Sequence, residues 1–255
     1  MTSQKLPVAL ITGGAKRIGA AIVNDLAVHG FAVAIHANRS RDEALRKVEE
    51  INAKGGRACA VFGDLTDSAN VGSIIDQAEA ALGPVQILVN SASVFQKDSA
   101  AAPDVAQFDA HFDVHVKAPA LLSARMVERL PQGSEGLIVN VIDQRVWRLT
   151  PHFFSYTLSK AALWTATQTM AMAFAPHVRV NAIGPGPTLP NERQDMADFQ
   201  AQVDAVPLRH APSLDEFGAT VRYLWAAKSV TGQMIALDSG QHLAWETPDV
   251  LNANE

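Results

Sequence analysis

The chain has 255 residues and a formal net charge of −5, with one cysteine. This length fits one large α/β domain that buries its own core, and the negative charge disfavours a general nucleic-acid binder, which needs a basic face. The lone Cys59 excludes a disulfide framework within the chain, and we find neither a signal-peptide pattern nor an apolar stretch long enough to span a bilayer, so we expect a cytoplasmic protein without membrane partners.

Short apolar runs alternate with helical patterns along the chain. We expect strands at 8–11, 31–35, 57–62, 85–89, 137–142, 178–183 and 234–237. We expect helices at 18–29, 41–54, 67–82, 104–130, 153–175 and 214–227, and a polar lid over a substrate pocket near 189–207. Alternating strands and helices predict a parallel sheet covered on both faces, in a single domain over residues 1–255.

The turn after the first strand predicts an anion site. Thr12-Gly13-Gly14 end the strand, and Gly19 lies where the helix begins. Glycines let the backbone approach a ligand, and a helix N-terminus directs unpaired N–H groups at a phosphate. Lys16 and Arg17 add positive charge. An ordinary strand-to-helix turn has the same glycines, so both interpretations stay open for this turn alone.

The end of the second strand favours NADP over NAD. An acidic residue that binds the ribose is expected there in NAD sites, and the segment His36-Ala37-Asn38-Arg39-Ser40 contains none. An arginine at this point can accept a 2′-phosphate. The alternative is that Arg39 faces water and Ser40 caps the next helix.

Tyr156 and Lys160 form a candidate catalytic pair. Their spacing places the phenol and the ammonium on one helix face. A nearby cation favours the phenolate, so we expect Lys160 to lower the pKa of Tyr156 and to let it exchange a proton near neutral pH. A surface pair without function has the same spacing.

Taken together, these motifs resemble the short-chain dehydrogenase/reductase family over nearly the whole chain. The motifs that carry the resemblance are Thr12-Gly13 through Gly19, Asp64, Asn90-Ser91-Ala92-Ser93, Tyr156 with Lys160, Asn181, Pro185-Gly186 and the ending Thr231 to Gly240. The resemblance implies a Rossmann-type, doubly wound parallel sheet and hydride transfer with a nicotinamide cofactor. It also implies that Tyr156 is the proton donor and that Lys160 holds the nicotinamide ribose.

The same resemblance implies the cofactor site. Asp64 is expected at the adenine ring, Asn90 beside the cofactor, and Pro185, Gly186 and Thr188 around the nicotinamide. The residues expected to bind NADP(H) are Thr12, Gly13, Lys16, Arg17, Ile18, Gly19, His36, Asn38, Arg39, Ser40, Asp64, Leu65, Asn90, Ser91, Ala92, Ser93, Tyr156, Lys160, Pro185, Gly186 and Thr188.

Four departures from the family pattern narrow the function. Arg17 replaces a glycine, Asp143 replaces the usual catalytic serine, and Asn90 to Ser93 replaces Asn-Asn-Ala-Gly. These three resemble the pteridine reductase branch, which includes bacterial dihydromonapterin and dihydrofolate reductases. The fourth, His115 at the position of the helix asparagine that supports a proton relay, is not explained by that branch.

The resemblance to that branch implies a reaction on a pterin or folate. NADPH would give a hydride to a C=N carbon, and the catalytic residues Asp143, Tyr156 and Lys160 would supply the proton to nitrogen. Phe95 would stack on the pterin, and Arg17 would bridge the cofactor phosphate and the substrate. The alternatives are that Phe95 anchors a loop in the core, that Arg17 binds phosphate alone, and that Asp143 only caps a turn after the strand. The residues expected to bind substrate are Arg17, Ser93, Phe95, Asp143 and Tyr156.

Alternatives stay open from the sequence. The chain could reduce a carbonyl, such as an oxoacyl thioester or a ketone, or it could be a non-catalytic NADP-binding regulator. His111 and His115 have the spacing to face one metal, but no third ligand is in view and we expect no metal. The family resemblance also implies a homotetramer, packed through the helices at 104–130 and 153–175.

Overall fold

The computed structural model describes residues 7–190 and 194–244. Its centre is one seven-stranded sheet in the order β3-β2-β1-β4-β5-β6-β7, and every neighbouring pair is parallel. The strands are β1 (Val8–Thr12), β2 (Ala32–Ala37), β3 (Ala58–Phe62), β4 (Val85–Asn90), β5 (Gly136–Val141), β6 (Val178–Pro185) and β7 (Met234–Leu237). This order is that of a Rossmann-type fold, as predicted.

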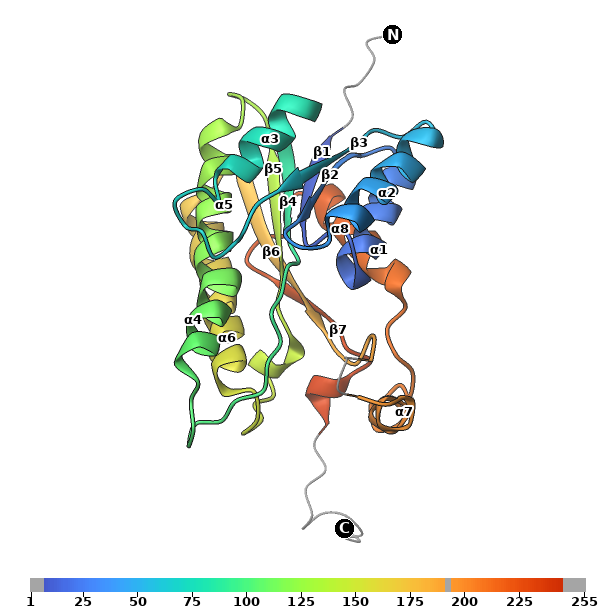
Figure 1. Cartoon of the computed structure of the whole chain (residues 1–255), viewed down its shortest axis with the longest axis vertical. Helices are drawn as coiled ribbons and strands as arrows, with labels where there is room; N and C mark the ends of the chain where they lie inside the picture. The colour runs from blue at the N-terminus through green and yellow to red at the C-terminus, as the bar shows by residue number, and fades with distance from the viewer. Residues whose placement is uncertain (1–6, 191–193, 245–255) are drawn as a thin grey trace, which may run out of the picture.

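Helices cover both faces of the sheet (Figure 1). One face carries α3 (Ser73–Leu82), α4 (Val105–Phe112), α5 (Ala118–Arg129) and α6 (Phe154–Ala173), and the other carries α1 (Arg17–Val28), α2 (Arg41–Ala53) and α8 (Leu214–Ala226). The short α7 (Met196–Asp204) lies near the end of β7. Among the described residues, no helix is both long and apolar enough to cross a membrane.

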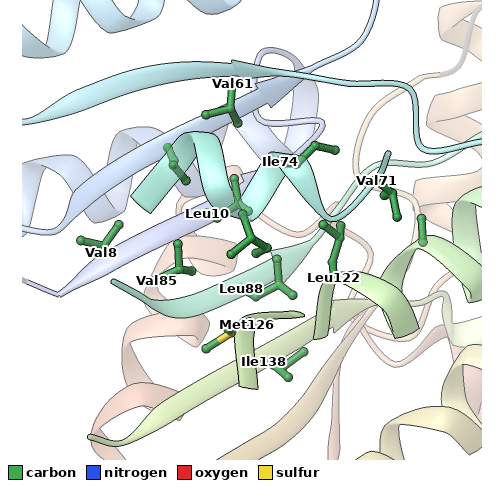
Figure 2. Close-up of a cluster of buried hydrophobic side chains, with 14 of the residues drawn as sticks. Val8, Leu10, Val61, Val71, Ile74, Val85, Leu88, Leu122, Met126 and Ile138 are labelled. Carbon is green, nitrogen blue, oxygen red and sulfur yellow. The ribbon is translucent and has the colours of Figure 1, made fainter. Parts of the chain in front are cut away.

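Two apolar layers hold the sheet between its helices. Figure 2 shows part of one layer, where Leu10 and Leu88 of the central strands pack with Ile74 of α3 and Leu122 of α5. The opposite layer joins the strands to α1 and α8. Every residue of β1, β2 and β5 is buried. A strand with both faces covered has no solvent side, which explains its continuous apolar run.

Two predicted helices begin later in the structure than expected. Residues 67–72 form turns, so the helix expected at 67–82 begins at Ser73. The side chain of Asp67 accepts hydrogen bonds from the N–H of Ala69 and the amide of Asn70, which compete with helix formation. The helix expected at 153–175 begins at Phe154, because Phe153 has a left-handed φ of 59°.

The helical region expected at 104–130 is interrupted by a π-helical turn, Asp113–Lys117. It lies between α4 and α5, with Pro119 in the first turn of α5. Proline has no N–H to bond the carbonyl four residues before it, here that of His115. The turn therefore widens at His115, and such turns often occur at functional sites.

Candidate active site

The carboxyl ends of six strands surround a cavity of about 960 Å³. It lies where the strand order reverses between β1 and β4, the usual ligand position in open parallel sheets. Twenty of the residues predicted to bind cofactor or substrate, or to act in catalysis, line it: Gly13, Lys16, Arg17, Ile18, Gly19, His36, Asn38, Arg39, Ser40, Asp64, Leu65, Ser91, Ala92, Ser93, Phe95, Asp143, Tyr156, Lys160, Pro185 and Gly186.

Three of the predicted cofactor residues are not in the lining. Thr12 is buried, and its Oγ1 accepts hydrogen bonds from the N–H groups of Ser91 and Ala92 at 3.0 and 3.1 Å. Asn90 is buried and donates to Asn140 Oδ1, and Thr188 donates to the carbonyl of Gly186. Thr12 and Asn90 therefore hold the strand ends in register beneath the cavity.

The turn after β1 requires its glycines. Gly13 has a φ of 63°, and a Cβ there would lie 2.9 Å from Ala92 Cα. A Cβ on Gly19 would lie 2.4 Å from the carbonyl oxygen of Gly13. The N-terminus of α1 receives no side-chain cap and has no acidic residue in its first turn. Its N–H groups therefore remain for an anion.

The two basic residues of this turn have protein partners. Lys16 Nζ lies 2.7 Å from Glu43 Oε1. The Arg17 guanidinium donates to the carbonyl oxygens of Pro190 and Leu189 at 3.0 and 3.3 Å, so it links the turn to the first described residues of the predicted lid. Arg17 has a φ of 52°, in the left-handed region that favours glycine. Residues 191–193 of that lid lie outside the described residues.

The far end of the cavity has the groups that a 2′-phosphorylated ribose requires. The exposed Asn38 and Arg39 follow β2, with no acid among residues 36–40. Asp64 is exposed across from them, and hydrogen bonds from the N–H and hydroxyl of Thr66 lower the pKa of its carboxyl. Arg39, with no carboxylate beside it at the end of β2, fits the 2′-phosphate of NADP rather than the 2′-hydroxyl of NAD.

His36 stabilises this end as a neutral ring. Its Nδ1 accepts from the N–H of Gly13 at 3.3 Å, and its Nε2 lies 3.1 Å from the carbonyl oxygen of Gly63. Nδ1 therefore has no proton and Nε2–H donates. Burial lowers the pKa of His36, in keeping with the neutral form.

The predicted catalytic residues meet at the opposite end. Tyr156 Oη donates to Asp143 Oδ2 at 3.0 Å. Asp143 Oδ1 accepts from the N–H of Arg145 at 2.9 Å, and the Arg145 guanidinium lies 3.8 Å from Oδ2. Lys160 Nζ donates to the carbonyl of Val141 at 2.9 Å and lies 5.7 Å from the centre of the Tyr156 ring.

The expected effect of Lys160 on Tyr156 is wrong for this arrangement. Burial, followed by the charge of Asp143, raises the pKa of Tyr156 well above its usual value. Lys160 itself is buried, which lowers its pKa to about 8. The Tyr156 side chain is therefore a protonated phenol that donates to Asp143, rather than a phenolate.

An aromatic cluster adjoins this pair. The Phe95 and Phe153 rings stack with centroids 4.4 Å apart, and Phe95 meets Tyr156 edge-on at 4.8 Å. The Arg145 guanidinium lies 5.2 and 5.0 Å from the centres of Phe95 and Phe153. The sequence analysis did not select Phe153 or Arg145. Arg145 follows Asp143 by two residues in the sequence, and this short spacing could have indicated that Arg145 lies at the site.

His111 and His115 lie behind Tyr156 and do not form a metal site. Each of their four ring nitrogens has a protein partner. Within the described ranges, no group of three His, Cys, Asp or Glu side chains is placed to bind a metal ion.

Comparison with known proteins decides the family. A family model described as short chain dehydrogenase matches residues 7–201. The chain belongs to the short-chain dehydrogenase family.

Two solved structures similar to this short-chain dehydrogenase are FolM alternative dihydrofolate reductase 1 from Brucella canis and from Brucella suis, each in complex with NADP. The first is 58% identical with a TM-score of 0.95, over 96% of this chain and 98% of that one. The second is 58% identical with a TM-score of 0.94, over 98% and 100%. Dihydromonapterin reductase from Escherichia coli O6:H1 is 30% identical, over 94% of this chain and 98% of its own length.

Proposed function

We propose that this chain is an NADPH-dependent reductase that transfers a hydride to a C=N bond of a pterin or a dihydrofolate. The observation that carries the proposal is the Asp143 carboxylate, which accepts the Tyr156 hydroxyl at 3.0 Å inside the dinucleotide cavity. The names of the 58% identical Brucella reductases and of the Escherichia coli dihydromonapterin reductase support the same substrate class.

NADP(H) fits the cavity. The Gly13 turn and the uncapped start of α1 would receive the pyrophosphate, and Arg39 with Ser40 would receive the 2′-phosphate. Asp64 and Leu65 would adjoin the adenine. Lys160 would hold the nicotinamide ribose, and Pro185 and Gly186 would lie beside the nicotinamide ring.

NADPH, when bound, would supply the hydride for the imine carbon and become NADP. Tyr156 would give its proton to the imine nitrogen, so that C=N becomes CH–NH. A phenol with a raised pKa keeps this proton until a basic nitrogen is present. Asp143 orients the Tyr156 hydroxyl, and its carboxylate would also accept hydrogen bonds from pterin N–H groups. A serine hydroxyl at this position would lack the negative charge of the carboxylate.

The substrate would lie between the nicotinamide and the Phe95 ring. Ser93, Phe95 and Asp143 line the cavity on that side. Arg17, which holds Leu189 and Pro190, would couple the pyrophosphate turn to a lid formed by 189–207. Through this position beside the lid, Arg17 would also contact the substrate.

The test is a substrate panel. The purified chain is mixed with NADPH and, separately, with dihydromonapterin, dihydrobiopterin and dihydrofolate, and absorbance reports NADPH oxidation. Turnover on at least one pterin or folate is expected, with little on an oxoacyl thioester or a simple ketone. Turnover on the carbonyl compounds alone would assign a carbonyl reductase. Tight NADPH binding without turnover on any compound would assign a regulator.

We also propose a cytoplasmic homotetramer. The apolar side chains of Leu121 on α5 and of Leu158 and Met172 on α6 are 38, 39 and 73% exposed, which supports packing of these helices between subunits. Sedimentation at micromolar concentration should give a tetramer, and a monomer would contradict the proposal. The single free Cys59 fits a reducing compartment.

A further inference from the structure

Two histidines and two serines connect neighbouring helices behind the catalytic tyrosine. His111 lies in the last turn of α4 and His115 lies in the π-helical turn, while Ser155 and Ser159 lie on α6 on either side of Tyr156. Figure 1 shows α4 alongside α6, and the two helices are in contact. The Nδ1 atoms of the histidines lie 2.7 Å from Ser155 Oγ and 2.8 Å from Ser159 Oγ, respectively.

The other ring nitrogens bind the loop that follows β4. The N–H of Val94 donates to His115 Nε2 at 3.1 Å, and the N–H of Gln96 donates to His111 Nε2 at 3.4 Å. A backbone N–H can only donate, so neither Nε2 carries a proton. Both rings are then neutral Nδ1–H tautomers that donate to the serines. Ser159 Oγ in turn donates to the carbonyl of Tyr156 at 2.7 Å.

Burial also favours the neutral form of both rings. His111 and His115 are 0% and 1% exposed. Burial lowers the pKa of both rings; the charge of Lys160 acts in the same direction on both, whereas that of Asp98 opposes it at His111. The titratable groups that face the pair are thus Tyr156 and Lys160 on α6 and Asp98 in the loop.

The loop held by the histidines carries the proposed substrate wall. Phe95 lies between Val94 and Gln96 and contacts the Tyr156 ring edge-on. The rings of His111 and His115 also meet that tyrosine edge-on, at 5.9 and 5.4 Å. The loop is tied to the same helix a third time by Asp98, whose carboxylate accepts from the N–H of Ser155 at 3.1 Å.

We propose that His111 and His115 are paired positioning residues that fix the 93–96 loop against the helix of Tyr156, and thereby hold Phe95 in its edge-on position against the phenol, beside the space where the pterin would bind. The inference rests on the proposed function for the identity of the substrate. In the neutral tautomers that the hydrogen bonds require, His115 has no free proton to pass on, so it serves as a structural link rather than as a proton relay.

The tautomer is the first test, and it needs no substrate. Nitrogen-15 spectra of the histidine rings in the unsubstituted protein should show His111 and His115 as neutral Nδ1–H tautomers at pH 7. A charged ring, or a proton on Nε2 of either, would overturn the proposal. This result is independent of whether the protein reduces a pterin.

Conservative variants are the second test. In His115→Asn, the side-chain amide reaches the Nδ1 position and keeps Ser159 but leaves the N–H of Val94 without its acceptor. The KM for the pterin should rise about tenfold, with kcat and the NADPH Kd changed less than about threefold. His115→Gln, whose longer amide reaches the Nε2 position, should restore most of the KM. His111→Asn and His111→Gln should behave in the same way toward Gln96.

A matched control and a pH profile separate this role from general stability. Ser123→Ala alters another buried side chain of the same helical region; Ser123 Oγ has no partner within the described residues, and the KM should not change. In the unsubstituted protein, protonation of either ring places a donor against a donor. Because burial lowers the pKa of both rings, the pterin KM should rise only at a pH below the ordinary histidine pKa of about 6.5, and furthest below it for His115. An unchanged KM in both asparagine variants, in a protein that reduces pterins, would overturn the inference and leave the proposed function intact.

Discussion

Just after β2, and across from it at Asp64, the cavity wall presents exposed polar side chains, whereas at the start of α6 it presents the buried Tyr156 and Lys160. Asn38, Arg39 and Asp64 are open to water. Tyr156 and Lys160 are 6% and 2% exposed. The first region presents charges that solvent screens, and it suits the recognition of a phosphate. The second has no such screening, and it is suited to proton chemistry.

The pKa directions follow this difference. At Asp64, hydrogen bonds from Thr66 outweigh the small effect of burial and lower the pKa. At Tyr156 and Lys160, burial is the largest effect and opposes the charged form of each group. Substitutions in the buried region should therefore alter catalysis and the pH dependence, and substitutions in the exposed region should alter cofactor affinity.

The largest effect should come from Tyr156→Phe. This change removes the proton donor and keeps the ring, so kcat on the pterin should fall by about 10³ or more. The NADPH Kd from fluorescence titration should stay within about twofold. Tyr223→Phe is the matched control, because Tyr223 is the other tyrosine of the chain and is 54% exposed. Catalysis that survives in Tyr156→Phe would reject the assigned proton donor.

Lys160→Met should change the pH dependence of stability. The pKa of Lys160 is about 8 in the folded chain and about 10.4 when unfolded. Between these values the unfolded state binds more protons, so the free energy of unfolding rises with pH, by up to about 3 kcal/mol. The methionine variant should lack this rise and should lose catalysis.

Chemical denaturation of both proteins at pH 7.5 and 10 measures the difference, with the exposed Lys54→Met as the control. The raised pKa of Tyr156 adds an opposite slope above its unfolded pKa near 10. That contribution occurs in both proteins and largely cancels. Equal slopes in the two proteins would contradict the lowered pKa of Lys160.

The two regions also differ in how far the sequence predicts them. The Gly13 turn, Arg39 and the Tyr156–Lys160 spacing are local patterns, and the structure brings all of them to one cavity. The sign of the Tyr156 pKa shift was predicted wrongly, because burial depends on the whole fold. The bonds of His111 to Ser155 and of Asp98 to the same residue join positions 44 and 57 apart in the chain. No local pattern specifies such a pairing.

Asp143→Ser tests the feature that separates a pterin reductase from a carbonyl reductase. A serine is too short to keep both the 3.0 Å contact to Tyr156 and the 2.9 Å contact to the N–H of Arg145. We expect kcat/KM on the pterin to fall about 30-fold, which corresponds to the loss of a charged hydrogen bond. A variant that reduces pterins as well as the parent, or gains on ketones without losing pterins, would reject the role of Asp143.

Asp143→Asn sharpens the same test. The asparagine keeps an acceptor for the tyrosine but removes the charge that helps to raise the pKa of Tyr156. The pKa of the phenol should fall. The alkaline limb of the pH–rate profile should therefore move to lower pH. The serine variant loses geometry as well as charge, so comparison of the two separates orientation from electrostatics.

The smallest effect should come from Arg39→Ala in the exposed region. Loss of the cation that would meet the 2′-phosphate should raise the NADPH Kd about tenfold and leave NADH binding unchanged, because NADH lacks that phosphate. The difference should shrink as the salt concentration rises, since solvent ions screen an exposed pair. Arg46→Ala, which removes an exposed arginine of α2, controls for net charge. An equal loss of NADH affinity would mean that Arg39 stabilises the loop after β2 rather than binding the phosphate. It would contradict the assignment of the exposed region to phosphate recognition.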